Sequence, residues 1–150
     1  MKIGDKIPEV LGVDQDGNTV KASDFAGKKL IIYFYPKDNT PGCTAEACSL
    51  STGYGALKRA GYALLGVSKD SAASHQKFIA KHTLPFPLIA DTDTALNQAF
   101  GVWREKKMAG RTYMGTVRTT FIVDEQGTVV HIIDKVNTKD SANQILELNL

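Results

Sequence analysis

The sequence has little cysteine and no strong excess of charge of either sign. Its 150 residues include two cysteines, and 18 basic against 16 acidic side chains give a net charge of +2. A secreted disulfide framework normally uses more bridges to hold a small core together, so these two cysteines do not indicate one. The weak and evenly spread charge offers no electrostatic footprint for nucleic acid or for an anionic membrane surface. We therefore expect neither nucleic acid nor a membrane as a partner.

Long apolar runs and clustered metal ligands are also missing. No run approaches the roughly 20 apolar residues of a membrane-spanning helix, and residues 1–8 carry charges and a proline where a signal peptide needs an apolar stretch. We therefore expect a soluble protein of the cytoplasm. A structural zinc site usually needs four closely spaced ligands, whereas His75, His82 and His131 lie far from the cysteines in sequence. We interpret the histidines as surface or half-buried residues and expect no metal.

The length and the order of elements predict one layered domain over residues 1–150. With 43% hydrophobic residues, the chain can bury one ordinary core, and it shows no linker. The sequence predicts, in chain order, a hairpin of strands at 10–13 and 19–21, a turn or short helix at 23–27, a strand at 30–35, a helix at 44–60, a strand at 62–68, a helix at 71–81, an edge or irregular strand at 84–90, a short helix at 93–100, a loop or extended connection at 103–116, a hairpin of strands at 119–123 and 128–133, and a final helix from 140 or 141. This order predicts an α/β fold with a mixed central β-sheet flanked by helices and an N-terminal β-hairpin, an arrangement that includes the thioredoxin-like fold.

The two cysteines, Cys43 and Cys48, lie directly after the apolar run at 30–35. Pro36 ends that run, and the sequence from Thr44 onwards favours a helix, so we expect Cys43 at or near the first helical turn. Unpaired N–H groups and the positive end of the helix dipole favour an anion there, which makes Cys43 a candidate reactive thiolate. The alternative is a pair of inert buried thiols, which are common in cytosolic proteins.

The residues just before Cys43 fit a reactive crevice. In open α/β sheets such a crevice lies beyond the carboxyl ends of the strands, where helix N-termini converge. Pro41 and Gly42 make the approach to the helix tight, and Thr40 can direct its hydroxyl at the thiolate or at a small polar substrate. The alternative role of Thr40 is that of an N-cap or turn residue.

The spacing of the two cysteines predicts a conformational change. On a regular helix, residues five apart have Cα atoms about 8.6 Å from each other, beyond the roughly 7 Å limit for a disulfide. If Cys43 and Cys48 share one helix, a bond between them requires local unwinding. The reduced and oxidised forms should then differ in backbone structure.

The residues around Cys43 resemble a known family. Pro36, Thr40 and Cys43 match the P-x-x-x-T-x-x-C signature of the peroxiredoxins, and the stretch 35–48 is similar to the subfamily called peroxiredoxin Q or bacterioferritin comigratory protein. Further matches to this subfamily follow as Gly-Val-Trp-Arg-Glu-Lys-Lys-Met at 101–108, Tyr-Met-Gly at 113–115 and Arg-Thr-Thr-Phe at 118–121. The order of elements also matches over nearly the whole chain.

The resemblance implies a thiol-dependent peroxidase that reduces hydrogen peroxide and alkyl hydroperoxides without any cofactor. Cys43 would be the peroxidatic cysteine, whose thiolate attacks the peroxide and becomes a sulfenic acid. Thr40 and the backbone N–H groups around Gly42 and Cys43 would hold the peroxide, beside Pro36. Arg118 would supply further donors and stabilise the thiolate.

The resemblance also implies how the enzyme is recycled. Cys48 would resolve the sulfenic acid through an intramolecular disulfide, which thioredoxin or a similar dithiol would reduce. Glu46 would belong to a proton or hydrogen-bond network near Cys43, the alternative being a partner of the helix dipole. Trp103 and Met108 would form an apolar wall beside the site. The subfamily suggests a monomer or weak homodimer.

Two other classes of function compete with the peroxidase. One is a general dithiol–disulfide oxidoreductase or redox-sensing module. Such enzymes usually carry two cysteines separated by two residues, and their chemistry does not need Thr40 or Arg118 as a peroxide clamp. The other is a non-catalytic binding or chaperone-like domain. The rate of oxidation by peroxide separates these hypotheses.

Overall fold

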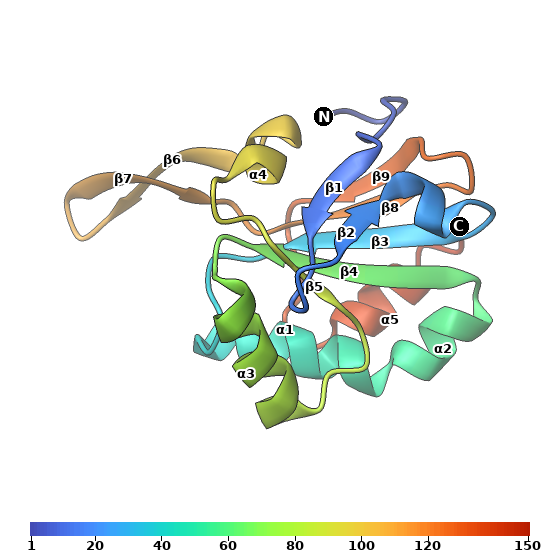
Figure 1. Cartoon of the computed structure of the whole chain (residues 1–150), viewed down its shortest axis with the longest axis horizontal. Helices are drawn as coiled ribbons and strands as arrows, with labels where there is room; N and C mark the ends of the chain where they lie inside the picture. Colours follow the sequence, from blue (N-terminus) through green and yellow to red (C-terminus); the bar gives the residue numbers. More distant parts are fainter.

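A five-stranded mixed sheet forms the centre of the molecule. The structure is a computed structural model and describes all residues from 1 to 150. Its elements are β1 (Val10–Val13), β2 (Thr19–Lys21), the 3-10 helix η1 (Ala22–Phe25), β3 (Lys29–Phe34), α1 (Pro41–Thr52), α2 (Tyr54–Arg59), β4 (Tyr62–Ser68), α3 (Ala72–His82), β5 (Leu88–Ala90), α4 (Ala95–Ala99), β6 (Trp103–Met108), β7 (Arg111–Thr116), β8 (Thr119–Val123), β9 (Val129–Ile133) and α5 (Ser141–Leu146). The central sheet has the order β5-β4-β3-β8-β9 (Figure 1). The predicted mixed sheet and N-terminal hairpin are both confirmed.

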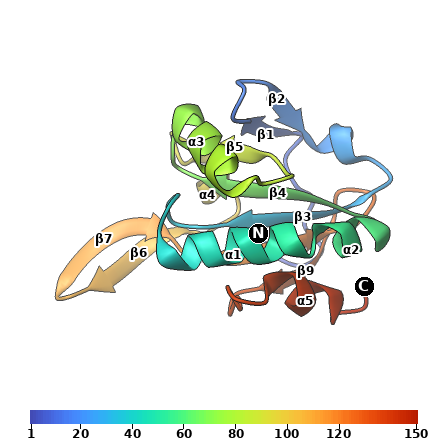
Figure 2. The ribbon, with the colours of Figure 1, turned by 90° about the horizontal axis from the view of Figure 1, so that it is seen from below.

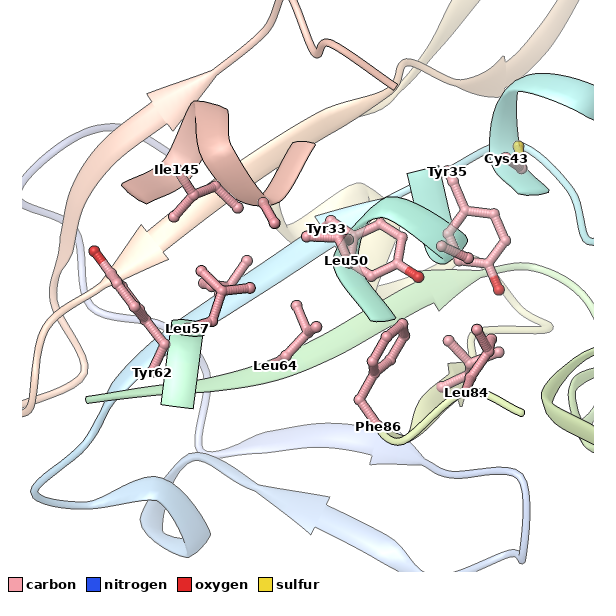
Figure 3. Close-up of a cluster of buried hydrophobic side chains, with 14 of the residues drawn as sticks. Tyr33, Tyr35, Cys43, Leu50, Leu57, Tyr62, Leu64, Leu84, Phe86 and Ile145 are labelled. Carbon is pink, nitrogen blue, oxygen red and sulfur yellow. The ribbon is translucent and has the colours of Figure 1, made fainter. Parts of the chain in front are cut away.

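Strand β3 lies at the middle of the sheet because it is apolar on both faces. It pairs in parallel with β4 and antiparallel with β8. Ile31 and Tyr33 pack into the core cluster that includes side chains of α1, α2, α3 and α5, whereas Leu30, Ile32 and Phe34 pack into the cluster that includes β1, β2 and α4. A continuous apolar run is typical of a strand covered on both sides. Figure 2 shows the layer of helices against the sheet, and Figure 3 shows the helical-side cluster with Cys43 at its end.

The helix after β3 begins earlier than predicted and is divided in two. It begins at Pro41, and Gly53 separates α1 from α2 where the sequence predicts one helix. A Cβ atom on Gly53 would lie 2.3 Å from the Cβ of Ala142. Glycine therefore allows α5 to pack closely at this point, and α1 ends there.

The connection predicted as a loop is instead a hairpin. Strands β6 and β7 pair antiparallel along their whole length, and the hairpin extends away from the central sheet (Figures 1 and 2). Ala109 and Gly110 at its turn have φ values of +52° and +77°, which matches the preference of tight hairpins for positive φ. This segment shows no strand pattern because most of the hairpin is exposed, so its residues do not alternate between apolar and polar.

The antiparallel pairing of β3 and β8 positions the candidate site. Phe34, the last residue of β3, pairs with Thr119, the first residue of β8. The chain that leaves β3 toward α1 therefore starts beside the chain that enters β8 at Arg118. None of the helices meets the length and hydropathy that a membrane-spanning helix needs.

Candidate active site

Cys43 lies in the first turn of α1, as predicted. It follows Pro41, the first helical residue, and Gly42. The N–H groups of Gly42 and Cys43 meet no acceptor in the protein, as is usual in a first helical turn. These two donors and the positive end of the helix dipole favour negative charge next to the Cys43 sulfur. Only 2% of Cys43 is exposed.

Arg118 reaches Cys43 from the other side of the site. Its Nη2 donates to the Cys43 Sγ at 3.3 Å, and its Nη1 donates to Glu46 Oε1 at 2.7 Å. A Cβ atom on Gly42 would lie 3.2 Å from Nη2, so glycine leaves room for the guanidinium. Burial acts to lower the pKa of Arg118, but Glu46 and Cys43 outweigh it and raise that pKa. The guanidinium is therefore a fixed positive charge beside the sulfur.

Glu46 is fully buried beneath the guanidinium. It lies one helical turn after Cys43, so the two side chains share a face of α1. Burial raises the pKa of Glu46 to about 7, and the charge of Arg118 acts in the opposite direction. Its Oε1 accepts from Arg118, while its Oε2 has no partner in the protein. The carboxylate thus bonds Arg118 rather than a backbone N–H of the first turn.

Thr40 occupies the N-cap position of α1 without capping the helix. Its backbone is extended and its side chain makes no cap hydrogen bond. The hydroxyl instead donates to the carbonyl oxygen of Lys37 at 3.1 Å. Thr40 and the half-buried Pro36 lie in the short loop that joins β3 to α1. The structure thus brings the predicted site residues at 36–43 together with Glu46 and Arg118 at the N-terminal end of α1.

Cys48 lies farther along the same helix. It is half-buried, and its Sγ is 3.9 Å from His82 Nδ1 in α3. Both cysteines are free thiols. Their five-residue separation on α1 corresponds to about 8.6 Å between Cα atoms, too far for a disulfide without local unwinding. Cys48 also lines a shallow groove of about 490 Å³ beside residues of α5.

The prediction of an apolar wall is wrong for Met108. That side chain is 64% exposed near the turn of the β6–β7 hairpin. Trp103 lies at the other end of β6 and is half-buried, with the Lys69 ammonium 5.6 Å from its ring centroid. Met108 lies away from the site because the β6–β7 hairpin extends outward. The sequence pattern predicted a loop here and therefore did not indicate this direction.

Sequence reasoning also missed a buried polar cluster next to the site. His75, interpreted as a surface or half-buried residue, is fully buried and bonds Asp38. Two signals in the sequence could have indicated this cluster. Asp38 lies within the stretch 35–48 that carries the family resemblance. Tyr33 and Tyr35 belong to the apolar run at 30–35, and buried tyrosine hydroxyls usually need hydrogen-bond partners. Tyr35 bonds Asp38, whereas the Tyr33 hydroxyl is buried without a partner. Burial and then the charge of Glu46 raise the pKa of Tyr33 well above its ordinary value.

No group of three or more histidine, cysteine, aspartate or glutamate side chains could hold a metal ion. The structure brings a thiol, a guanidinium, a buried carboxyl group and backbone N–H donors together at the N-terminus of α1. A thiolate held between helix N–H groups and a guanidinium is a nucleophile suited to a small electrophile, and the same donors can stabilise charge on a leaving oxygen.

Known proteins match nearly the whole chain. A family model described as the AhpC/TSA family matches residues 3–132. Peroxiredoxin Bcp of Bacillus subtilis (strain 168) is 42% identical over 147 residues, which cover 98% of this chain and 94% of that protein. A cysteine-to-serine variant of Xylella fastidiosa PrxQ has a TM-score of 0.90 at 33% identity, covering 99% of this chain and 95% of that one. The Xanthomonas campestris bacterioferritin comigratory protein, whose structures address its alkyl peroxide reduction activity, has a TM-score of 0.85 at 37% identity over 96% of both chains.

These matches agree with the fold and with the family suggested by the cysteine motif. The structural neighbours confirm the thioredoxin-like fold. The relatives confirm the resemblance to peroxiredoxin Q and to bacterioferritin comigratory protein. The chain therefore belongs to the AhpC/TSA family and, within it, to the peroxiredoxins of the Q or Bcp type, which are thiol-dependent peroxidases.

Proposed function

We propose that Cys43 is the peroxidatic cysteine and that Cys48 resolves it. The observation that carries this assignment is the hydrogen bond from Arg118 to the Cys43 sulfur at the N-terminus of α1. In the first step the Cys43 thiolate attacks one peroxide oxygen, the O–O bond breaks, and the second oxygen leaves as hydroxide or alkoxide. Cys43 becomes a sulfenic acid, and the leaving oxygen takes a proton to form water or an alcohol.

The donors around Cys43 hold the peroxide and stabilise the leaving oxygen. The N–H groups of Gly42 and Cys43 are free to donate to it, and the guanidinium of Arg118 neutralises charge that develops during attack. The Thr40 hydroxyl, whose proton is directed at Lys37, has lone pairs left to accept a hydrogen bond from the O–H of a peroxide. We expect the half-buried Pro36 to lie beside the bound peroxide. The burial of Cys43 limits direct access to small reactants.

Glu46 holds Arg118 in the orientation that faces Cys43. Its Oε1 accepts one arm of the guanidinium, so the other arm is directed at the sulfur. With a pKa raised to about 7 by burial, Glu46 exchanges a proton near neutral pH. We assign it to the hydrogen-bond network of the site rather than to the attack itself.

Cys48 completes the cycle after α1 unwinds. Its thiol attacks the Cys43 sulfenic acid, a disulfide forms, and one water leaves. Thioredoxin or a similar dithiol then reduces this disulfide by two thiol–disulfide exchanges. The groove beside Cys48 gives the second thiol a solvent-facing position in the reduced form.

We propose hydrogen peroxide and alkyl hydroperoxides as substrates. The alkyl peroxide reduction activity of the Xanthomonas campestris relative supports the second class. A dithiol reductant is available in the cytoplasm, where we expect the enzyme to act. We expect a monomer or a weak homodimer.

A stopped-flow experiment tests these assignments. Reduced protein is mixed with one equivalent of hydrogen peroxide, Trp103 fluorescence is followed, and the products are determined by mass spectrometry. We expect oxidation far faster than that of a free thiol, ending in a disulfide between Cys43 and Cys48. The Cys43→Ser variant should consume no peroxide. Oxidation at the rate of a free thiol would refute the role given to Cys43.

A further inference from the structure

A buried polar cluster anchors the loop that carries Thr40. This loop runs from Tyr35, the residue after β3, to Thr40, the N-cap residue of α1. Asp38 lies at its middle and is only 4% exposed. A carboxylate is rarely buried to this degree unless it is paired. Nothing in the proposed peroxide chemistry uses Asp38, so its burial needs another explanation.

Asp38 joins the loop to two neighbouring segments and also forms a bond within the loop. Its Oδ1 accepts from the Tyr35 hydroxyl at 2.6 Å, and its Oδ2 accepts from the Ser74 hydroxyl and from His75 Nδ1, each at 2.8 Å. Its backbone N–H donates to Asp70 Oδ2 at 2.9 Å. The loop is thereby attached to α3 and to the β4–α3 connection, and the bond from Tyr35 to Asp38 closes the loop on itself.

His75 faces this carboxylate with one ring nitrogen and a backbone carbonyl with the other. The ring is fully buried, and its Nε2 lies 2.9 Å from the carbonyl oxygen of Ile89 while Nδ1 faces Asp38. Both partners can only accept hydrogen bonds when Asp38 is ionised, so the ring satisfies both only with a proton on each nitrogen. Burial acts to raise the pKa of Asp38, but the bonds from His75, Tyr35 and Ser74 outweigh burial and lower that pKa.

The position of Asp38 constrains Thr40 because only a short length of chain joins the two residues. Only Asn39, held at a φ of +64°, separates Asp38 from Thr40. The Thr40 hydroxyl donates to the carbonyl of Lys37, the residue just before Asp38. The rotamer of Thr40 therefore depends on the fold of the loop that Asp38 anchors.

We propose that Asp38 and His75 are positioning residues for the peroxide step, holding Thr40 and the first turn of α1 in their reactive geometry without touching the peroxide. This inference rests on the roles proposed above for Cys43 and Thr40. A displacement of about 1 Å in a reactive geometry can lower a rate about 100-fold. Loss of the bonds that anchor the loop should therefore slow the attack of Cys43 on peroxide. The Cys43 thiolate should still react with reagents that do not depend on Thr40 for orientation.

The test compares two reactions of one thiol. All variants carry Cys48→Ser, so that Cys43 is the only cysteine. The rate constants for hydrogen peroxide and for iodoacetamide are measured by quenching and mass spectrometry, and circular dichroism confirms the fold. Asp38→Asn should slow the peroxide reaction about tenfold to 100-fold and change the iodoacetamide reaction less than about twofold. Tyr35→Phe, which removes one hydrogen bond and keeps the ring, should slow the peroxide reaction by a smaller factor.

Two further comparisons separate a positioning role from a general loss of stability. His75→Asn keeps an amide donor near the position of Nδ1 and should retain more peroxide reactivity than His75→Ala. Asp91→Asn is the matched control, because Asp91 is also a buried carboxylate but bonds the first residues of α4. It should lower stability without a selective loss of peroxide reactivity.

The inference is wrong if Asp38→Asn leaves the peroxide rate unchanged, or if both reactions slow by the same factor. It is also wrong if Asp91→Asn reproduces the selective loss, or if His75→Asn and His75→Ala are equally slow. A parent protein that reacts with peroxide no faster than a free thiol would instead refute the role of Cys43, and the positioning role would fall with it.

Discussion

Arg118 Nη2 lies 3.3 Å from Cys43 Sγ, although 75 residues separate the two in the chain. The contact forms because β8 runs antiparallel to β3, so the start of β8 lies beside the end of β3. Arg118, just before β8, is therefore close to the loop that leads from β3 to α1. The second arm of the guanidinium binds Glu46, which fixes the direction of the first. One side chain thus couples the reactive sulfur to a buried carboxyl group.

We expect Arg118→Ala to slow the reaction with hydrogen peroxide about 100-fold or more, the usual loss when one donor to a developing oxyanion is removed. Stopped-flow oxidation of the reduced protein measures the effect. The matched control is Arg104→Ala, because Arg104 is exposed and donates to the carbonyl of Gly101. A peroxide rate that is the same in Arg118→Ala and in the wild type would remove Arg118 from the first step.

Glu46 should make the stability of the fold depend on pH. Burial raises the pKa of Glu46 from 4.5 to about 7 in the folded protein, so between these values the folded state binds more protons than the unfolded state. The contribution of Glu46 to the free energy of unfolding therefore falls as pH rises through this window, by about 1.4 kcal/mol per pH unit and about 3 kcal/mol in total. Asp38, whose pKa is lowered, acts in the opposite direction at lower pH.

Glu46→Gln isolates this effect from the other carboxylates. Urea unfolding of the wild type and the variant is compared at several pH values between 4.5 and 8. The variant should gain stability relative to the wild type as pH rises, whereas Glu125→Gln, a change at an exposed position, should show a constant difference. A constant difference for Glu46→Gln as well would mean that the pKa of Glu46 is not raised.

The position of Cys43 in the first turn of α1 was predictable from sequence because its determinants are local. Cys43, Thr40 and Pro36 lie within one motif, and a proline followed by helix-forming residues fixes the start of α1. Arg118 was found only through the family motif, since in the sequence it is one charged residue in a region without a clear pattern.

Other features depend on packing between distant segments, and the sequence does not show them. The bond between Asp38 and His75 forms because α3 packs beside the loop after β3. The break at Gly53 follows from the close approach of Ala142 in α5. The β6–β7 hairpin was missed for a different reason, because an exposed hairpin needs no apolar alternation.

Replacement of Cys48 by serine should separate the two steps of the cycle. Cys48→Ser should still undergo the first oxidation but stall in turnover with a thioredoxin donor, because no second thiol is present to form the disulfide. Mass spectrometry should then detect sulfenic acid or overoxidised Cys43. Ser49→Ala, a change at the neighbouring position, serves as the control and should retain turnover. Full steady-state activity of Cys48→Ser with that donor would mean that Cys48 is not the resolving cysteine.

Oxidation should unwind α1 but leave α2 intact. A disulfide needs Cα atoms within roughly 7 Å, and the helix holds those of Cys43 and Cys48 about 8.6 Å apart. The break at Gly53 separates the two helices, so α2 need not follow. Hydrogen exchange of the reduced and disulfide forms should show loss of amide protection between residues 41 and 48 and retained protection in α2. Cys43→Ser treated with peroxide is the control and should show no change. Protection of α1 that is equal in both forms would mean that the disulfide forms without unwinding, and the coupling between catalysis and helix opening would be refuted.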